Sequence, residues 1–228
     1  MEIQNKKINF LGDSITEGVG ASSVEKRYTD LVAKRLGCRF VNYGISGTRI
    51  ARQKQTSAKT TWDIDFRTRL PLMEREADLV FIFGGTNDYG HGALHIGDVE
   101  SRDESTFCAQ LRLLIEDLIE KYGRERLCFM LPLRRFFEEP LACKGEERNE
   151  LGAPLSEYVE KMRRIISEYG IDYIDLYKNG IEKPETNLGD EYTVDGLHPC
   201  DKGYVLIADR VCEYIAARRT CDSAGAQL

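Results

Sequence analysis

The sequence lacks several features that would place the protein in a membrane, in an oxidising compartment or among metal-dependent folds. Residues 1–7 are polar and contain no apolar run of the kind found in a signal peptide. No hydrophobic run approaches the length needed to cross a bilayer. The seven cysteines show no Cys-x-x-Cys spacing, and their odd number indicates reduced thiols. These absences predict a cytoplasmic protein with no membrane span, no metal and no cofactor.

Two phosphate-binding signatures are also missing. The chain contains neither Gly-x-Gly-x-x-Gly nor the Gly-x-x-x-x-Gly-Lys-Ser/Thr loop. Its net charge of −6 disfavours a nucleic-acid partner, because non-specific binding depends on Lys and Arg neutralising phosphates. A non-catalytic protein that binds a nucleotide or a phosphate therefore stays only as a remote alternative, and we expect no nucleic-acid partner.

The length and composition are those of one folded domain. The chain has 228 residues with 31% charged residues of mixed sign, and it shows no repeat or low-complexity tract. A chain of this length can bury a large core without a disulfide or a metal. We expect a single domain over residues 1–219 and a frayed tail over residues 220–228. The sequence does not indicate the oligomeric state.

Short apolar runs alternate with helical patterns along the chain. The clearest strand is 79–83, which is apolar at every position, as is typical of a central parallel strand. Other strands are predicted at 7–11, 39–42, 126–131 and 171–176. Helices are predicted at 28–36, 107–122, 155–169 and 202–218. The alternation predicts a three-layer α/β/α sandwich with about five parallel strands.

Three segments have weaker patterns. The mixed segment 62–73 is expected to become helical toward Glu76, and a polar loop is expected from the third strand to about Asp103. The charged segment 133–152 has no clear assignment and is a candidate lid.

Residues suited to catalysis lie where predicted strands end. Ser14 follows Gly12 and Asp13 at the end of the first strand, on a turn that is favoured by all three residue types. The other turns are 44–47, 85–88 and 195–199. In an open α/β sheet, ligands bind outside the carboxyl ends of the strands, so we expect these four segments to converge at one edge.

A nucleophile, a base and an orienting acid can be assigned among these residues. A serine hydroxyl needs a base, which is usually a histidine, and the base needs an acceptor on its other ring nitrogen. His198 has Asp195 three residues earlier, so Ser14, His198 and Asp195 are the candidate catalytic residues. His91 and His95 lie in the polar loop and are expected to be exposed to solvent, because neighbouring glycines oppose a helical metal pair.

Acyl transfer also needs hydrogen-bond donors aimed at the developing oxyanion. The backbone N–H groups of Ser14 and Gly47 and the side-chain amide of Asn87 are the candidates. Simple turn geometry, or an Asx turn for Asn87, is the alternative for each residue alone. Asp13 is expected to brace the turn before Ser14 by accepting backbone N–H bonds.

Two further residues could act as nucleophiles, and two aromatic residues could line a pocket. Cys200 lies two residues from His198 and is better explained as a structural thiol, and Ser46 as a turn hydroxyl. Trp62 and Tyr89 are candidate substrate contacts, although an aromatic side chain is more often part of the core.

Four segments together resemble the sequence blocks of the SGNH, or GDSL-type, hydrolase family, in the family's order. They are Phe10-Leu-Gly-Asp-Ser-Ile-Thr-Glu-Gly18, Asn42-Tyr-Gly-Ile-Ser-Gly47, Gly85-Thr-Asn-Asp88 and Asp195-Gly-Leu-His-Pro199. The resemblance implies a flavodoxin-like sandwich and a metal-independent serine esterase. By position it implies Ser14 as nucleophile, His198 as base, Asp195 as its partner, and Gly47 and Asn87 in the oxyanion hole.

The sequence indicates the type of reaction more clearly than it indicates the substrate. We expect a small-molecule ester with a short acyl group, such as acetyl on a carbohydrate. The alternative is a lysophospholipase or thioesterase that acts on longer acyl chains. This choice rests on analogy with the family rather than on particular residues.

Overall fold

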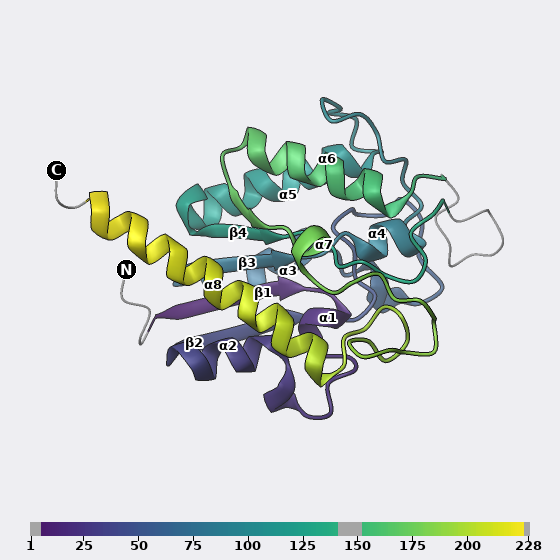
Figure 1. Ribbon diagram of the computed structural model, residues 1–228. Helices are drawn as coiled ribbons and strands as arrows, with labels where there is room; N and C mark the ends of the chain where they lie inside the picture. Colours follow the sequence, from purple (N-terminus) through teal and green to yellow (C-terminus); the bar gives the residue numbers. More distant parts are fainter. Residues whose placement is uncertain (1–5, 141–151, 226–228) are drawn as a thin grey trace.

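The computed structural model describes residues 6–140 and 152–225, and its centre is a sheet of five parallel strands (Figure 1). The strands are β1 (Lys7–Gly12), β2 (Arg39–Gly44), β3 (Leu79–Phe83), β4 (Leu127–Met130) and β5 (Asp172–Ile174). Their order is β2-β1-β3-β4-β5, which is the flavodoxin-like order. In this order the direction of strand addition reverses between β1 and β3, and ligands bind at such a reversal.

Helices cover both faces of the sheet, so the predicted three-layer α/β/α sandwich is confirmed (Figure 1). One face packs against α2 (Tyr28–Leu36) and α8 (Asp201–Gly225). The other face packs against α3 (Phe66–Arg69), α5 (Phe107–Tyr122) and α6 (Leu155–Glu168). Shorter elements join these layers: α1 (Ser14–Glu17), α4 (Thr86–His91), α7 (Leu176–Asn179), and the 3-10 turns η1 (Val24–Lys26), η2 (Thr60–Asp63), η3 (Leu70–Leu72) and η4 (Arg124–Arg126).

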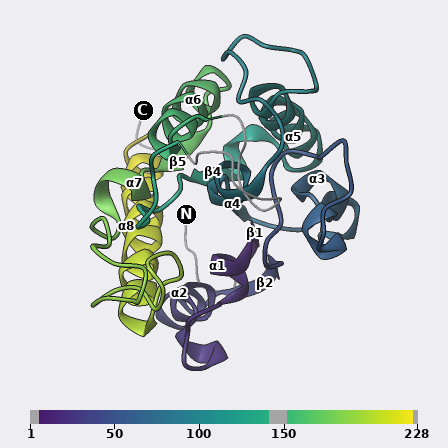
Figure 2. The ribbon, with the colours of Figure 1, turned by 90° about the vertical axis from the view of Figure 1, so that its right-hand side faces the viewer.

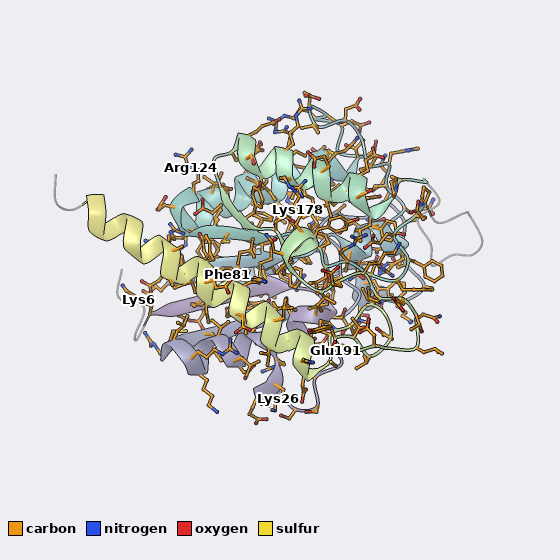
Figure 3. All side chains as sticks on the ribbon, in the orientation of Figure 1. Lys6, Lys26, Phe81, Arg124, Lys178 and Glu191 are labelled. Atoms are coloured by element: carbon orange, nitrogen blue, oxygen red, sulfur yellow. The ribbon has the colours of Figure 1, made fainter. Side chains whose placement is uncertain are left out.

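Strand β3 shows why the sheet is buried on both sides. Its five residues are all buried, and their side chains alternate between the two faces. Val80 and Ile82 belong to the apolar cluster beneath α5 and α6, whereas Phe81 belongs to the cluster beneath α2 and α8. Figure 3 labels Phe81 in the interior of the molecule and the charged Lys6, Lys26 and Arg124 toward its periphery.

The strand register places the predicted site residues at one edge. Gly12, the last residue of β1, pairs with Gly44 at the end of β2 and with Phe83 at the end of β3. The segments that leave these strands therefore start at the same level. Figure 2 turns this edge toward the viewer and shows α1 and α4 lying near each other there.

Several sequence predictions about individual elements are wrong. The segment before β3 contains η2, α3 and η3, but no helix reaches Glu76, because Met73 has an extended conformation after the proline-containing turn η3. The polar loop after β3 begins with the helix α4, in spite of its internal Gly90. Helix α8 continues to Gly225 instead of ending near Arg218.

The candidate lid over 133–152 lies partly outside the described residues. Residues 133–140 form an irregular segment after β4, and residues 141–151 are not described. The lid therefore stays a prediction.

Candidate active site

Ser14 lies at the sharp turn where β1 passes into α1. A Cβ on Gly12 would lie 1.9 Å from Thr16 Oγ1, so the chain can close this turn only because residue 12 is glycine. The carboxylate of Asp13 caps α1 by accepting a hydrogen bond from Ile15 N at 3.0 Å. The turn directs a nearly buried Ser14, 6% exposed, toward the edge of the sheet.

The imidazole of His198 lies between Ser14 and Asp195. Its Nε2 is 3.0 Å from Ser14 Oγ, and its Nδ1 is 2.7 Å from Asp195 Oδ2. A carboxylate can only accept from Nδ1–H, which leaves Nε2 unprotonated and able to accept the serine proton. The three side chains therefore have the contacts of a nucleophile, a base and an orienting acid.

The loop that carries Asp195 and His198 is fixed by its own hydrogen bonds. Asp195 Oδ1 accepts from the backbone N–H groups of Leu197 at 3.0 Å and His198 at 2.7 Å. Gly196 has a φ of +74°, a left-handed conformation that lets the carboxylate fold back on the chain. Burial raises the pKa of Asp195, but the hydrogen bonds from the His198 side chain and from backbone N–H groups outweigh it, so the net shift is downward and the group stays ionised.

Three candidate donors lie on the segments that leave β1, β2 and β3. The N–H of Ser14 is at the first position of α1, where no helical acceptor exists for it. Gly47 follows β2 with a φ of +75°, and its N–H lies on the next loop. Asn87, on α4, donates one amide hydrogen to Thr48 O at 3.0 Å, which leaves its second amide hydrogen for another acceptor.

Two carboxylates with no role predicted from the sequence, the buried Asp88 and the exposed Glu17, brace the loop between β2 and η2. Asp88 accepts from Ile50 N at 3.0 Å and from Ala51 N at 2.9 Å. Glu17 accepts from Ser46 N at 2.6 Å. Both carboxylates lie within the quoted sequence blocks, so their position beside the candidate catalytic residues was the available signal.

Arg69 is a further brace that no motif indicated. It is 3% exposed, and its Nη1 donates to Gly12 O at 2.7 Å and also to Tyr43 O. Its Nη2 donates to Thr48 Oγ1 at 3.0 Å. One guanidinium thus joins the ends of β1 and β2 to the loop that carries Gly47.

Two buried carboxylates beside the serine have unusual acidities. Burial raises the pKa of Asp13 to about 6, against the lowering effects of the Ile15 N–H, His198 and Arg69. Burial likewise raises the pKa of Asp88 to about 6, although two backbone N–H groups stabilise its ionised form. Of the two, Asp13 interacts with His198, the candidate base that must be neutral to act, whereas Asp88 holds the backbone of Ile50 and Ala51.

The two aromatic candidates for substrate contact, Tyr89 and Trp62, differ in exposure. Tyr89 is fully buried and donates from its hydroxyl to Glu139 O at 2.7 Å, so it is a core residue and not a substrate contact. Trp62 lies directly beside Gly47, because a Cβ on that glycine would be 2.0 Å from Trp62 Nε1. Trp62 is partly exposed, so its role as a substrate contact stays a prediction.

His91 is not the exposed residue that the sequence predicted. It is partly buried and stacks on Trp62, with a distance of 4.1 Å between ring centroids. Burial, together with the charges of Arg49 and Arg135, lowers its pKa to about 3. His95 is exposed, as predicted, and lies beyond the end of α4.

The described residues contain neither a metal-binding cluster nor a membrane-spanning helix. No group of three or more His, Cys, Asp or Glu side chains is arranged to hold a metal ion within residues 6–140 and 152–225. In the same residues, no helix combines the length and the apolar character that crossing a bilayer requires.

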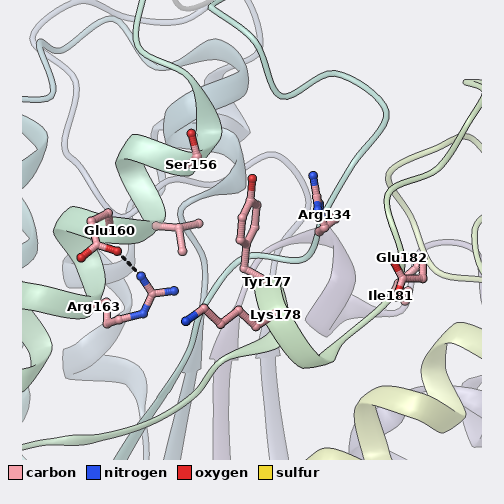
Figure 4. Close-up of a pocket in the computed structure, with 9 residues that line it drawn as sticks. Arg134, Ser156, Glu160, Arg163, Tyr177, Lys178, Ile181 and Glu182 are labelled. Atoms are coloured by element: carbon pink, nitrogen blue, oxygen red, sulfur yellow. Dashed lines mark hydrogen bonds and ion pairs between the residues drawn. The ribbon is translucent and has the colours of Figure 1, made fainter.

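A separate surface pocket of about 410 Å³ lies between α6 and α7 and contains none of the triad residues (Figure 4). It is lined by Ser156, Arg163 and Lys178 among others, and Arg134 lies at its edge. Its arginines have acidic partners, since Arg134 pairs with Glu138 at 2.9 Å and Arg163 pairs with Asp175 at 2.8 Å.

The flavodoxin-like sheet order defines a doubly wound α/β protein, and the contacts of Ser14, His198 and Asp195 are typical of hydrolases that act through an activated serine. The comparison with family models makes the assignment more specific. Residues 10–206 match the model of the GDSL-like lipase/acylhydrolase family. The chain belongs to this family, as the sequence resemblance predicted, and is a hydrolase of ester bonds that acts on a small-molecule substrate.

Solved structures share the fold over nearly the whole chain. A protein from Lactobacillus plantarum is 26% identical with a TM-score of 0.76, covering 94% of this chain and 98% of its own. A lipase/acylhydrolase from Enterococcus faecalis is 23% identical with a TM-score of 0.59, covering 93% and 96%. A member of the lipolytic G-D-S-L family from Veillonella parvula is 20% identical with a TM-score of 0.59, covering 91% and 96%. No curated protein matches the chain.

Proposed function

We propose that the protein is a serine esterase in which Ser14, His198 and Asp195 form the catalytic triad. The observation that carries the proposal is the continuous hydrogen-bonded chain from Ser14 Oγ to His198 Nε2 at 3.0 Å and from His198 Nδ1 to Asp195 Oδ2 at 2.7 Å. Ser14 Oγ attacks the ester carbonyl as His198 takes its proton. His198 then gives this proton to the leaving alkoxide, which departs as an alcohol and leaves an acyl-enzyme.

Water completes the reaction through the same residues. His198 removes a proton from the water, the hydroxide attacks the acyl carbon, and the bond to Ser14 Oγ breaks as that oxygen regains a proton. In both steps the carbonyl oxygen becomes negative. The N–H groups of Ser14 and Gly47 and the free amide hydrogen of Asn87 are the proposed donors to this oxyanion. Asp13 stabilises the turn by accepting the hydrogen bond from Ile15 N.

We further propose a short acyl group, such as acetyl on a carbohydrate. The support for a short group is the position of Trp62, whose ring occupies the space beside Gly47 and is held there by stacking on His91. This pair limits the room next to the proposed oxyanion hole. Trp62 is also partly exposed, so part of its ring remains available for contact with a sugar.

The test compares purified wild-type protein with Ser14→Ala and His198→Ala on 4-nitrophenyl esters from acetate to palmitate and on acetylated oligosaccharides. We expect each substitution to lower kcat by about 10⁴-fold or more. Matched controls are Ser156→Ala, in the separate pocket, and His95→Ala, on the surface, which we expect to keep wild-type kcat. Near-normal turnover by Ser14→Ala would contradict the triad, and a maximum at long chains would contradict the short acyl group.

A further inference from the structure

Arg135 lies on the irregular segment after β4, against the helix that carries Asn87. Its Nη1 is 3.2 Å from Thr86 Oγ1 and 3.3 Å from Thr86 O, one residue before Asn87. A Cβ on Gly90 would lie 3.1 Å from the same nitrogen, so the guanidinium lies along the surface of α4. Its central carbon is 5.3 Å from the centre of the Tyr89 ring.

The same segment is also attached to the loop of the triad. Phe136 N donates to Gly196 O at 2.8 Å, which joins the residue after Arg135 to the residue after Asp195. Burial lowers the pKa of Arg135, whereas Tyr89, Asp195 and Asp13 act in the opposite direction. The guanidinium is therefore within electrostatic range of Asp13 and Asp195, and its segment contacts both the helix of Asn87 and the loop of His198.

The Arg135 guanidinium is largely shielded from water and has no acidic partner among the described residues, whereas its backbone N–H donates to Glu138 Oε1 at 3.0 Å. Among the described residues, no carboxylate oxygen lies within 4.0 Å of its guanidinium nitrogens, and its Nε and Nη2 donate to no described acceptor. The preceding residue differs, because Arg134 Nη2 is 2.9 Å from Glu138 Oε2. A shielded charge without a counter-ion is costly unless a partner arrives.

The chemistry of the guanidinium indicates what kind of partner fits. Its planar fork offers parallel N–H donors that match the oxygens of a carboxylate, a sulfate or a phosphate. The contacts to Thr86 restrain the guanidinium through Nη1 and leave the donors on Nε and Nη2 without a described acceptor.

We propose that Arg135 binds an anionic group on the substrate, so that the enzyme is selective for esters that carry a carboxylate, sulfate or phosphate near the scissile bond. The inference rests on the proposed function, because it assumes that the ester is cleaved at Ser14. It names the substrate class for that site and assigns Arg135 as a specificity-determining residue.

The experiment compares charged and neutral esters of matched size. One pair, 3-acetoxybenzoate and phenyl acetate, places the charge on the leaving group. The second pair, mono-4-nitrophenyl glutarate and 4-nitrophenyl valerate, places it on the acyl group. The kcat and KM values of each pair are measured for wild type, Arg135→Gln, Arg135→Lys and the matched control Arg134→Gln.

We expect wild type to favour the charged member of at least one pair in kcat/KM. Arg135→Gln should lower that charged-to-neutral ratio about 10- to 100-fold, mainly through KM, as expected for loss of a charge-assisted hydrogen bond. Arg135→Lys should give an intermediate ratio, because lysine keeps the charge but loses the fork. Arg134→Gln should keep the wild-type ratio. The pair that responds identifies which side of the ester carries the anion.

Failure of the anion site and failure of the proposed function give different results. If hydrolysis depends on Ser14 but Arg135→Gln keeps the wild-type ratio, only the anion site is wrong. If no ester is hydrolysed in a Ser14-dependent manner, the proposed function itself is wrong. Should Arg135→Gln fail to fold, the wild-type ratios decide: neutral esters that are equal or preferred in both pairs overturn the proposal, and a charged preference that falls with ionic strength supports it.

Discussion

At the scale of single residues, the two amide hydrogens of Asn87 have different roles, one structural and one proposed to be catalytic. One hydrogen bonds to Thr48 O at 3.0 Å, and the other is the proposed donor to the oxyanion. We expect Asn87→Ala to lower kcat about 10²- to 10³-fold, which is the usual cost of losing one such donor. Asn87→Asp keeps the shape but replaces the donor by an acceptor, and should lower kcat at least as much. Unchanged kcat in both variants would remove Asn87 from the oxyanion hole.

The positive φ of Gly47 and its close approach to Trp62 predict that a side chain at this position disturbs the loop. In Gly47→Ala the new methyl group meets the Trp62 ring, and a φ of +75° is strained for alanine. We expect displacement of the Gly47 N–H and a fall in kcat of about 10²-fold.

Gly152→Ala is the matched control for this prediction. Gly152 also has a positive φ, +68°, but no atom of the described residues lies within 4 Å of the added Cβ. It should therefore show the backbone strain alone, as a small loss of thermal stability with wild-type kcat. Equal kcat values in the two variants would show that the contact between Gly47 and Trp62 has no part in the reaction.

The candidate triad was predictable from the sequence because each member has a local signature. Ser14 lies on a glycine turn after an apolar run, and His198 has Asp195 three residues before it. Arg135 and His91 have no such signature. Their environments are made by residues distant in the chain, such as Thr86 for Arg135 and Trp62 for His91, and a single sequence does not show these contacts.

At the scale of elements, Arg69 on α3 links the carboxyl ends of β1 and β2 by hydrogen bonds. Replacement by methionine keeps an unbranched side chain but removes the guanidinium donor from the carbonyls of Gly12 and Tyr43, although Gly12 O keeps the hydrogen bond from Ile45 N at 3.2 Å. A hydrogen bond to a charged group contributes about 1.5–3 kcal/mol. We expect Arg69→Met to lower the free energy of unfolding by about 2–4 kcal/mol, measured by urea denaturation, and to lower kcat as the Gly47 loop loosens.

Arg67→Met on the same helix is the matched control. Arg67 pairs with Asp117 at 2.6 Å, with side chains 23% and 38% exposed. Such partly exposed pairs contribute about 0–1 kcal/mol. A loss of stability in Arg67→Met equal to that in Arg69→Met would show that Arg69 is not a special link between the strands.

The long elements were easier to predict than the short ones for a physical reason. Strand β3 and helix α5 bury an apolar face over their whole length, so their periodicity is visible in the sequence. Helices α3 and α4 have four and six residues, too few for a periodic pattern. Helix α4 forms in spite of Gly90, because tertiary contacts such as those of Asp88 with the backbone outweigh local propensity.

At the scale of the whole molecule, the sheet topology brings together residues from the two ends of the chain. Ser14 and His198 are 184 positions apart, yet the parallel register places their loops at one edge. The order of alternating strands and helices was enough to predict this convergence. It was not enough to predict which charged groups would be buried together there, because burial depends on packing across several elements.

The pH dependence of the free energy of unfolding tests the lowered pKa of one partly buried group, His91. His91 has a pKa of about 3 in the folded protein, against 6.5 for the free side chain. Between these values the unfolded chain binds more protons, so this residue lowers the stability of the folded state as the pH falls from 6.5 toward 3. His91→Phe keeps an aromatic ring against Trp62 and removes the titration. Asp13 and Asp88 shift in the opposite sense, but they are present in both proteins and cancel from the difference.

We therefore expect wild type to lose stability relative to His91→Phe by about 2 kcal/mol between pH 7 and pH 4.5, since each pH unit in this range contributes about 1.4 kcal/mol and partial exposure reduces the total. Urea denaturation of both proteins at several pH values measures this difference. His95→Phe, at an exposed position, is the control and should show no comparable trend. A constant difference between wild type and His91→Phe across the range would mean that His91 accepts a proton in the folded state, and that its stack on Trp62 opens in acid.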